Sequence, residues 1–280
     1  MMQPHGANSP LVSVHMPAYN HEAYIAQALE SALAQVTNFD FEIVVGEDCS
    51  TDGTRAVARD YAGRHPGRIV LIENERNLGI WENDRRIVDR CRGEFIAWLE
   101  SDDYWCVQDK LQRQVDMLAS HPGMSACFHR VRPLSAGALP ASWRNGPGDS
   151  KPIYTLDDLL EQGHFVPSCS AVFRSSHVRE PRLWTRATPF LEVTYFAYLA
   201  TQGDIGFIDE EMAVFRYHER GVYGQSSRTE QARLALDAHR LIGRHLGLER
   251  RESFRQGLAR LARQFDLAQT SDRTDTGGRQ

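Results

Sequence analysis

The stretch FIAWLESDDYW, residues 95–105, decides the fold, because an apolar run of strand length ends directly in a cluster of carboxylates. Residues 95–99 have the composition of a buried strand. Glu100, Asp102 and Asp103 follow at its carboxyl end, where their charges repel one another. A divalent cation with oxygen ligands would relieve that repulsion, whereas a solvated turn with Asp102 capping the next helix is the structural alternative.

Outward from this stretch, apolar segments of strand length alternate with amphipathic segments of helical period. In chain order they are strand 11–16, helix 22–34, strand 41–45, helix 54–61, strand 69–72 and helix 80–91. This alternation predicts an α/β fold with largely parallel strands, helices on both faces and ligands at the carboxyl ends of the strands. The loops 17–21, 46–52 and 100–105 should therefore line one crevice.

The second half of the chain is less regular. We expect a helix at 110–120, a strand at 125–131, a Gly/Pro-rich stretch at 133–152, a helix at 155–162, a short strand at 171–173, a helix at 190–201, strands at 205–208 and 212–217, and helices from about 230 and 252.

Length and composition exclude several classes of protein. The chain has 280 residues, 41% of them hydrophobic, which suits one large or two modest globular domains. A net charge of −5 argues against a nucleic-acid partner. Five scattered cysteines without a CxxC pair indicate neither a disulfide scaffold nor a zinc site. No apolar run is long enough to span a membrane and no signal peptide is recognisable, so we expect a cytoplasmic protein.

Four ordered segments of the chain resemble family 2 glycosyltransferases with the GT-A fold. They read VSVHMPAYN at 12–20, EIVVGEDCSTDGT at 42–54, NERNLG at 74–79 and GEFIAWLESDDYW at 93–105. Each segment alone is weak, but the ordered set is specific. The resemblance implies a Rossmann-like mixed sheet flanked by helices, here with a C-terminal helical extension.

The same resemblance implies an inverting transferase. Its donor would be a nucleotide-diphosphate sugar, most often a UDP-sugar, and its cofactor Mn²⁺ or Mg²⁺. The acceptor would be the hydroxyl of a sugar, a lipid-linked molecule or another compound. The setting would be bacterial polysaccharide, lipopolysaccharide or glycoconjugate biosynthesis.

Roles on the donor side follow from matching positions of the family pattern. Asp48 would accept a hydrogen bond from the nucleobase of the donor. Pro17 and Tyr19 would shape the nucleoside pocket, and Asn77 and Gly79 would border that pocket. The remaining donor-side positions are Ala18, Asn20, Glu47, Asn83, Ser101 and Asp102. Glu47 stands where many members have aspartate, and Trp81 departs from the family pattern in a way that leaves the sugar undetermined.

The metal ligands and the catalytic base are assigned in the same way, from matching positions of the family pattern. Asp102 would contact the ribose or sugar, and Asp103 would ligate the metal. His218 would ligate the metal or donate to a phosphate, with an ordinary hydrogen-bonded histidine as the alternative. Counting back from Gly203 places Glu192 at the position of the catalytic base. Its structural alternative is a carboxylate favoured by a helix N-terminus.

These assignments divide the chain into five parts: a flexible N-terminus at 1–10, a donor-binding half at 11–130, an acceptor and catalytic-base half at 131–227, C-terminal helices at 228–269 and a disordered tail at 270–280. The loop 219–227 has the composition of a flap over the donor. The arginines of the C-terminal helices include Arg233, Arg240, Arg244, Arg250, Arg251, Arg255, Arg260 and Arg263. Such helices can contact the inner face of a membrane peripherally, pack on the domain or pair with a second subunit in a homodimer.

Two other functions remain alternatives. A sugar nucleotidyltransferase would need a Gly-rich basic loop after the first strand, where this chain has PAYNHEAY. A non-catalytic nucleotide-sugar binding or regulatory protein would have no need of a base at Glu192. No GxGxxG or phosphate-binding P-loop is present.

Overall fold

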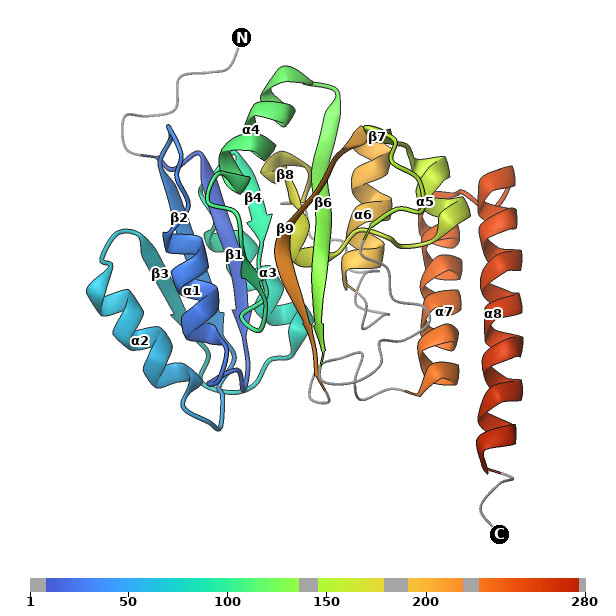
Figure 1. Cartoon of the computed structure of the whole chain (residues 1–280), viewed down its shortest axis with the longest axis horizontal. Coiled ribbons are helices and arrows are strands. Elements are labelled where there is room, and N and C mark those ends of the chain that lie inside the picture. The colour runs from blue at the N-terminus through green and yellow to red at the C-terminus, as the bar shows by residue number, and fades with distance from the viewer. Residues whose placement is uncertain (1–8, 136–145, 179–190, 219–226, 277–280) are drawn as a thin grey trace.

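A computed structural model describes residues 9–135, 146–178, 191–218 and 227–276 of the chain. Across these ranges nine strands form one mixed sheet with the order β3-β2-β1-β4-β8-β6-β9-β5, and β7 pairs with β9 beside this path. Figure 1 shows the sheet with helices packed around it and α7 and α8 at one side. The expected α/β architecture is confirmed.

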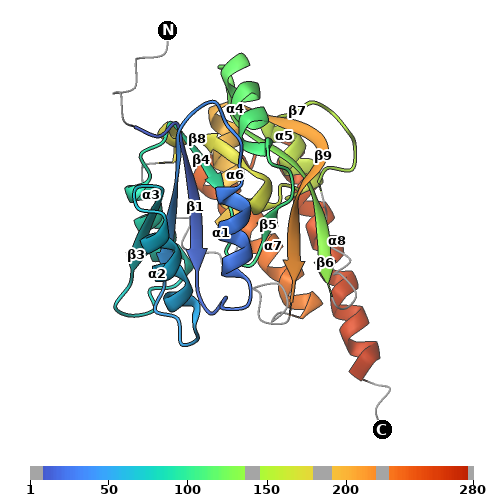
Figure 2. The same ribbon diagram turned by 60° about the vertical axis from the view of Figure 1, so that its left-hand side comes forward.

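The first half contains a regular strand–helix alternation. Its elements are β1 (Val12–Ala18), α1 (Ile25–Leu33), β2 (Phe41–Glu47), α2 (Thr54–Arg64), β3 (Ile69–Glu73), α3 (Ile80–Arg90), β4 (Phe95–Trp98), β5 (Tyr104–Trp105) and α4 (Lys110–Ser120). Strands β1, β2, β3 and β4 are mutually parallel, so their carboxyl ends lie at one edge of the sheet (Figure 2).

The second half completes the sheet and adds a helical layer. Its elements are β6 (Met124–Ser135), β7 (Ile153–Tyr154), α5 (Leu156–Gln162), η1 (Ser168–Ser170), β8 (Val172–Arg174), η2 (Ser175–His177), α6 (Leu191–Gln202), β9 (Asp204–Tyr217), α7 (Arg228–Leu246) and α8 (Glu252–Thr276). Thr155 caps α5 with a capping box, as its hydroxyl and the Asp158 carboxylate satisfy each other's backbone N–H groups.

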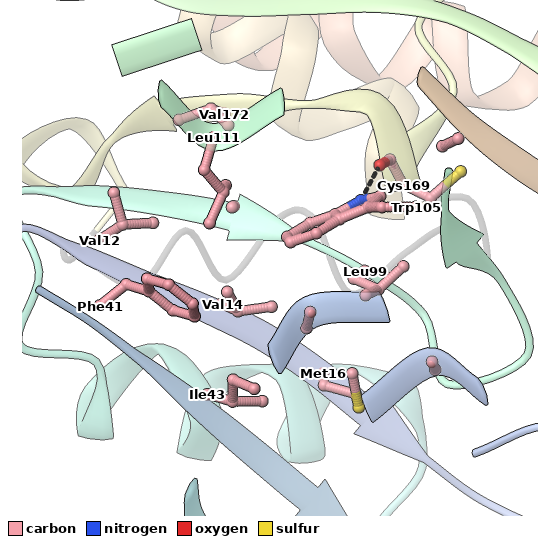
Figure 3. Close-up of a cluster of buried hydrophobic side chains, with 14 of the residues drawn as sticks. Val12, Val14, Met16, Phe41, Ile43, Leu99, Trp105, Leu111, Cys169 and Val172 are labelled. Atoms are coloured by element: carbon pink, nitrogen blue, oxygen red, sulfur yellow. Dashed lines mark hydrogen bonds between the residues drawn. The ribbon is translucent and has the colours of Figure 1, made fainter. Parts of the chain in front are cut away.

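Alternating side chains of the buried strands fill two cores, one on each face of the sheet. Val12, Val14 and Met16 pack with residues of α1, α2 and α4. Val44, Ile96 and Trp98 belong to the opposite core, together with residues of α3 and α6. Figure 3 shows the first core around Trp105, whose indole N–H donates to the Cys169 carbonyl oxygen at 2.8 Å. This bond fixes the chain directly after the acidic turn to η1.

The C-terminal helices pack on the domain. Ile242 of α7 and Phe254 of α8 form a third buried cluster with Leu156, Leu160 and Ala197. Among the described residues, no helix combines the length and the apolar character that crossing a membrane would require.

Two expectations about the second half were wrong. The segments 205–208 and 212–217 are one strand, β9, because irregular register opposite His129, Arg130 and Val131 lets pairing with β6 continue through the polar residues between them. Residues 270–276, expected to be disordered, are the end of α8. No glycine or proline interrupts the chain between Gly257 and Gly277, so the helix can continue. The flap expected at 219–227 falls outside the described residues except for Ser227.

Lys110 is an unusual member of the core. It is fully buried, and its ammonium lies 3.9 Å from the centre of the Trp105 ring. Its Nζ has no hydrogen-bond partner among the residues that the structure describes. Burial lowers the pKa of Lys110 from 10.5 to about 7.

We therefore expect Lys110→Met, which keeps an unbranched side chain out to the Cε position and removes the amino group, to raise the free energy of unfolding at pH 7 by about 1–3 kcal/mol. The pKa of Lys110 is lower in the folded than in the unfolded state, so between pH 7 and 10.5 the unfolded wild type binds more protons and wild-type stability rises with pH. The advantage of the variant should shrink over that range in urea unfolding. A variant less stable than wild type at pH 7 would contradict this account.

Candidate functional site

The carboxyl edge of the parallel strands gathers the three loops that the sequence predicts to line a crevice. Backbone hydrogen bonds join them: Asp48 N donates to the Ala18 carbonyl at 2.9 Å, and Ser101 N donates to the Pro17 carbonyl at 3.3 Å. His218, just beyond the end of β9, reaches the same place. The site is therefore built from four segments far apart in the sequence.

Asp102 is the acidic residue that faces these other segments. Its Oδ2 lies 3.0 Å from His218 Nε2 and 3.7 Å from His21 Nε2. Burial acts to raise the pKa of Asp102, but the hydrogen bond from His218 and the charges of both histidines outweigh it and hold the pKa below its ordinary value. Asp102 is thus kept ionised.

His21 is oriented by its other ring nitrogen. Its Nδ1 lies 2.8 Å from Ser101 Oγ, which leaves Nε2 directed toward Asp102. Burial lowers the pKa of His21, against the opposing effect of the Asp102 charge. A neutral imidazole with a free nitrogen is the form that binds metals.

Asp103 lies beneath the turn and is 1% exposed. Its Oδ1 accepts a hydrogen bond of 2.7 Å from the backbone N–H of Arg216 on β9. Burial, together with the charges of Asp102 and Glu100, raises the pKa of Asp103 well above its ordinary value. The Arg216 side chain also donates to the Asp102 carbonyl oxygen, so these contacts join the acidic turn to the end of β9.

Glu100 connects the turn to α6. Burial, with contributions from the charges of Asp102 and Glu192, raises the pKa of Glu100 to about 7, against a hydrogen bond from Ser168. Glu192 lies half-buried in the first turn of α6. The predicted base position therefore lies close enough to the acidic turn for the two carboxylates to influence each other.

Asp48 is 3% exposed and has three donors on its carboxylate. Oδ1 accepts from Asn74 Nδ2 and from the Leu78 N–H, each at 2.8 Å, and Oδ2 accepts from the Gly79 N–H at 2.9 Å. A carboxylate offers about four lone-pair positions, so one acceptor position remains.

Glu47 and Asn83 face inward. Glu47 is fully buried, and its two oxygens accept from Arg55 Nε at 2.5 Å and from the Ser50 N–H at 2.7 Å. Asn83 Nδ2 donates to the Gly46 carbonyl at 2.9 Å. Both residues support the loop that carries Asp48 rather than line the crevice.

The remaining donor-side residues form the exposed rim. Tyr19 is 42% exposed, so its ring is available for stacking. Asn20 has a positive φ of 56° and its Oδ1 accepts from the Thr51 N–H at 2.8 Å. Gly79 adopts a φ of 78°, and its N–H also contacts Asn77 Oδ1 at 3.0 Å.

One cluster of side chains fits a metal ion. Within the described residues, ligand atoms of His21, Asp102 and His218 all lie within 4.8 Å of one another. Two imidazole nitrogens and one carboxylate oxygen form a donor set that can hold a divalent transition metal, whereas Mg²⁺ prefers oxygen ligands. Asp103, predicted to be the metal ligand, lies below this cluster, and the neighbouring Asp102 faces it.

Sequence reasoning missed His21, Asn74 and Arg216. His21 directly follows the PAYN segment, so its place in the loop after β1 was a usable signal. Asn74 directly follows β3, and the rule that ligands gather at the carboxyl ends of parallel strands would have included it. Arg216 contacts the acidic turn through its backbone N–H and its side chain from a distant strand, for which no local sequence signal exists.

Comparisons with known proteins show which family the sequence resembles. Residues 13–180 match the family described as Glycosyl transferase family 2. An uncharacterized protein of Mycobacterium tuberculosis is 33% identical over 220 residues, which cover 76% of this chain and 60% of that protein. The chain therefore matches about three fifths of that relative's length. The putative teichuronic acid biosynthesis glycosyltransferase TuaG of Bacillus subtilis is 37% identical over 109 residues, covering 39% of this chain and 42% of TuaG.

Solved structures share the fold. S. aureus TarS in complex with UDP-GlcNAc is similar with a TM-score of 0.66 and 21% identity, over 90% of this chain and 72% of the TarS chain. The mannosyltransferase PcManGT of Pyrobaculum calidifontis, in complex with GDP-Man and Mn²⁺, gives a TM-score of 0.59 and 18% identity over 97% of this chain and 81% of its own. The fold is the GT-A fold of these glycosyltransferases.

We expect His21→Ala and His218→Ala each to weaken Mn²⁺ binding by about tenfold or more, because each removes one of three converging donors. Isothermal titration calorimetry with Mn²⁺ at pH 7.5 measures the effect. His121→Ala, which changes an exposed histidine after α4, is the matched control and should bind as wild type does. Mn²⁺ affinity unchanged in both site variants would exclude this cluster as the metal site.

Proposed function

The chain belongs to glycosyl transferase family 2, and on that basis we propose that it transfers a sugar from a UDP-sugar to an acceptor hydroxyl in bacterial polysaccharide synthesis. The observation that carries the proposal is the convergence of Asp48, the acidic turn and the two histidines at one edge of the sheet. The glycosyltransferase names of its relatives and the nucleotide-sugar complexes of its structural neighbours support the same function.

The donor's nucleoside would bind between Tyr19 and Asp48. The exposed Tyr19 ring can stack on the base, and the remaining acceptor position of Asp48 can take a base N–H. Pro17, Ala18, Asn20, Asn77 and Gly79 shape the loops around these two groups. UDP is favoured because TarS binds UDP-GlcNAc, and the sugar itself is left open.

The diphosphate would lie over His21, Asp102 and His218. These three residues would hold a divalent cation, for which their two imidazoles favour Mn²⁺. When bound, the cation would neutralise the charge that develops on the departing nucleoside diphosphate. Asp102 is kept ionised for this role by His218 and His21, while Asp103 and Ser101 hold the turn in place.

We assign the general base to Glu192, at the start of α6. In an inverting transfer the base removes the proton of the acceptor hydroxyl as its oxygen attacks the anomeric carbon. The place of Glu192 in the first turn of α6 and the effect of its charge on the pKa of Glu100 support this assignment. The acceptor would therefore approach between α6 and the donor crevice.

The arginine-rich helices α7 and α8 have no role in the proposed transfer. Arg233 pairs with Glu230, Arg251 with Asp157 and Arg255 with Glu252. Such pairing favours packing and surface ion pairs over contact with an anionic membrane. The acceptor, a second subunit and any membrane contact are left open.

We expect Glu192→Gln to keep the affinity for UDP with Mn²⁺ and to lower the rate of UDP release from the best UDP-sugar by about 10² to 10⁴-fold. Calorimetry measures binding and a coupled UDP assay measures turnover. Glu249→Gln, at an exposed position between α7 and α8, is the matched control.

Near-normal turnover of Glu192→Gln would remove this residue from the mechanism. Binding of UDP-sugars by the wild type without any transfer would favour a non-catalytic nucleotide-sugar binding protein instead.

A further inference from the structure

A buried polar chain joins β1, α3 and α6 behind the candidate site. Asp84 of α3 and His15 of β1 are each 3% exposed, and Asp84 Oδ1 lies 2.9 Å from His15 Nε2. The other oxygen, Oδ2, accepts a hydrogen bond of 2.8 Å from the Tyr195 hydroxyl on α6. The buried Asp84 carboxylate thus lies against β1 through one oxygen and is hydrogen-bonded to α6 through the other.

Tyr195 packs against an aromatic ring at this junction. Its ring centre lies 5.0 Å from that of Trp98, which also lies 5.9 Å from the His15 ring. Burial and the neighbouring Asp84 raise the pKa of Tyr195 well above its ordinary value, so the hydroxyl stays a donor. The tyrosine is held at both its ring and its hydroxyl.

The same turn of α3 is also connected to the nucleoside side of the site. Asn83, the neighbour of Asp84, accepts a hydrogen bond of 3.0 Å from Asn74 Nδ2, and that amide also donates to Asp48 Oδ1 at 2.8 Å. Asn83 and Asp84 are consecutive residues of α3. Asn83 is connected through Asn74 to Asp48, the carboxylate predicted to bind the nucleobase, and Asp84 is connected to α6.

Tyr195 stands three residues after Glu192, so the two side chains project from neighbouring positions on one face of α6. We propose that Asp84 and Tyr195 are positioning residues, which hold the first turn of α6, and with it Glu192, at a fixed place relative to the donor loops. This inference rests on the proposed function, because it supposes that Glu192 is the base. A carboxylate displaced by about 1 Å would lose much of its effect on the rate.

Tyr195→Phe tests the inference, because it removes one hydroxyl and leaves the ring. We expect kcat for UDP release to fall by about 10- to 100-fold, with the Kd for UDP and Mn²⁺ unchanged. Tyr154→Phe is the matched control: the Tyr154 hydroxyl also bonds an aspartate, Asp149, but Tyr154 is fully buried and lies on β7. The control should keep its kcat even where its melting temperature falls.

The double variant Glu192→Gln/Tyr195→Phe shows whether Tyr195 acts through Glu192. If it does, the double variant releases UDP no more slowly than Glu192→Gln alone. A kcat of Tyr195→Phe within twofold of that of Tyr154→Phe would overturn the inference, and so would a full additive loss in the double variant.

Hydrogen–deuterium exchange separates failure of this inference from failure of the proposed function. If the wild type transfers no sugar from any UDP-sugar, the proposed function fails, and exchange in residues 191–202 then decides the anchoring role by itself. Faster exchange there in Tyr195→Phe than in Tyr154→Phe supports the anchor, and equal exchange overturns it.

Discussion

Repulsion among the carboxylates of a single turn is the constraint on which the rest of this structure depends. Glu100, Asp102 and Asp103 follow one buried strand, and Asp103 is buried while the other two are partly buried. The repulsion is relieved differently at each: burial and the neighbouring charges raise the pKa of Glu100 and of Asp103, which favours their protonated forms, whereas His218 and His21 hold the pKa of Asp102 below its ordinary value. The turn thus presents the ionised Asp102 to the crevice, while Asp103 accepts a hydrogen bond from the backbone of β9.

Support for this turn comes from the whole sheet rather than from its own loop. The hydrogen bond from the Trp105 indole to the Cys169 carbonyl fixes the chain directly after the turn. The hydrogen bond from the Arg216 N–H to Asp103 joins the turn to the end of β9. On the opposite face of the sheet, Asp84 ties β1 and α3 to α6. These contacts connect the loops at the carboxyl edge of the sheet to the helix that carries Glu192, as the proposed displacement with Glu192 as the base would require.

Much of the fold and the outline of the site could be predicted from the sequence, because hydrophobic period fixes the strands and parallel strands bring their carboxyl ends together. The period of 110–120 gave helix α4 to the residue, and the loops after β1, β2 and β4 do meet. The sequence could not show which of the two neighbours, Asp102 or Asp103, faces the crevice. The direction of each side chain follows from the turn, and contacts with the distant Arg216 hold that turn. The place of His21 in the loop after β1 was predictable, but the orientation of its ring depends on Ser101, 80 residues away. The continuity of β9 depends on irregular pairing with β6, which leaves no local signal.

Pulsed electron paramagnetic resonance of Mn²⁺ bound to the protein with UDP tests the central claim most directly, because it detects nitrogen nuclei coordinated to the metal. The account predicts ¹⁴N couplings from two imidazoles, one of which disappears in each of the single variants His21→Ala and His218→Ala. A Mn²⁺ signal with oxygen ligands alone, unchanged by either substitution, would contradict it.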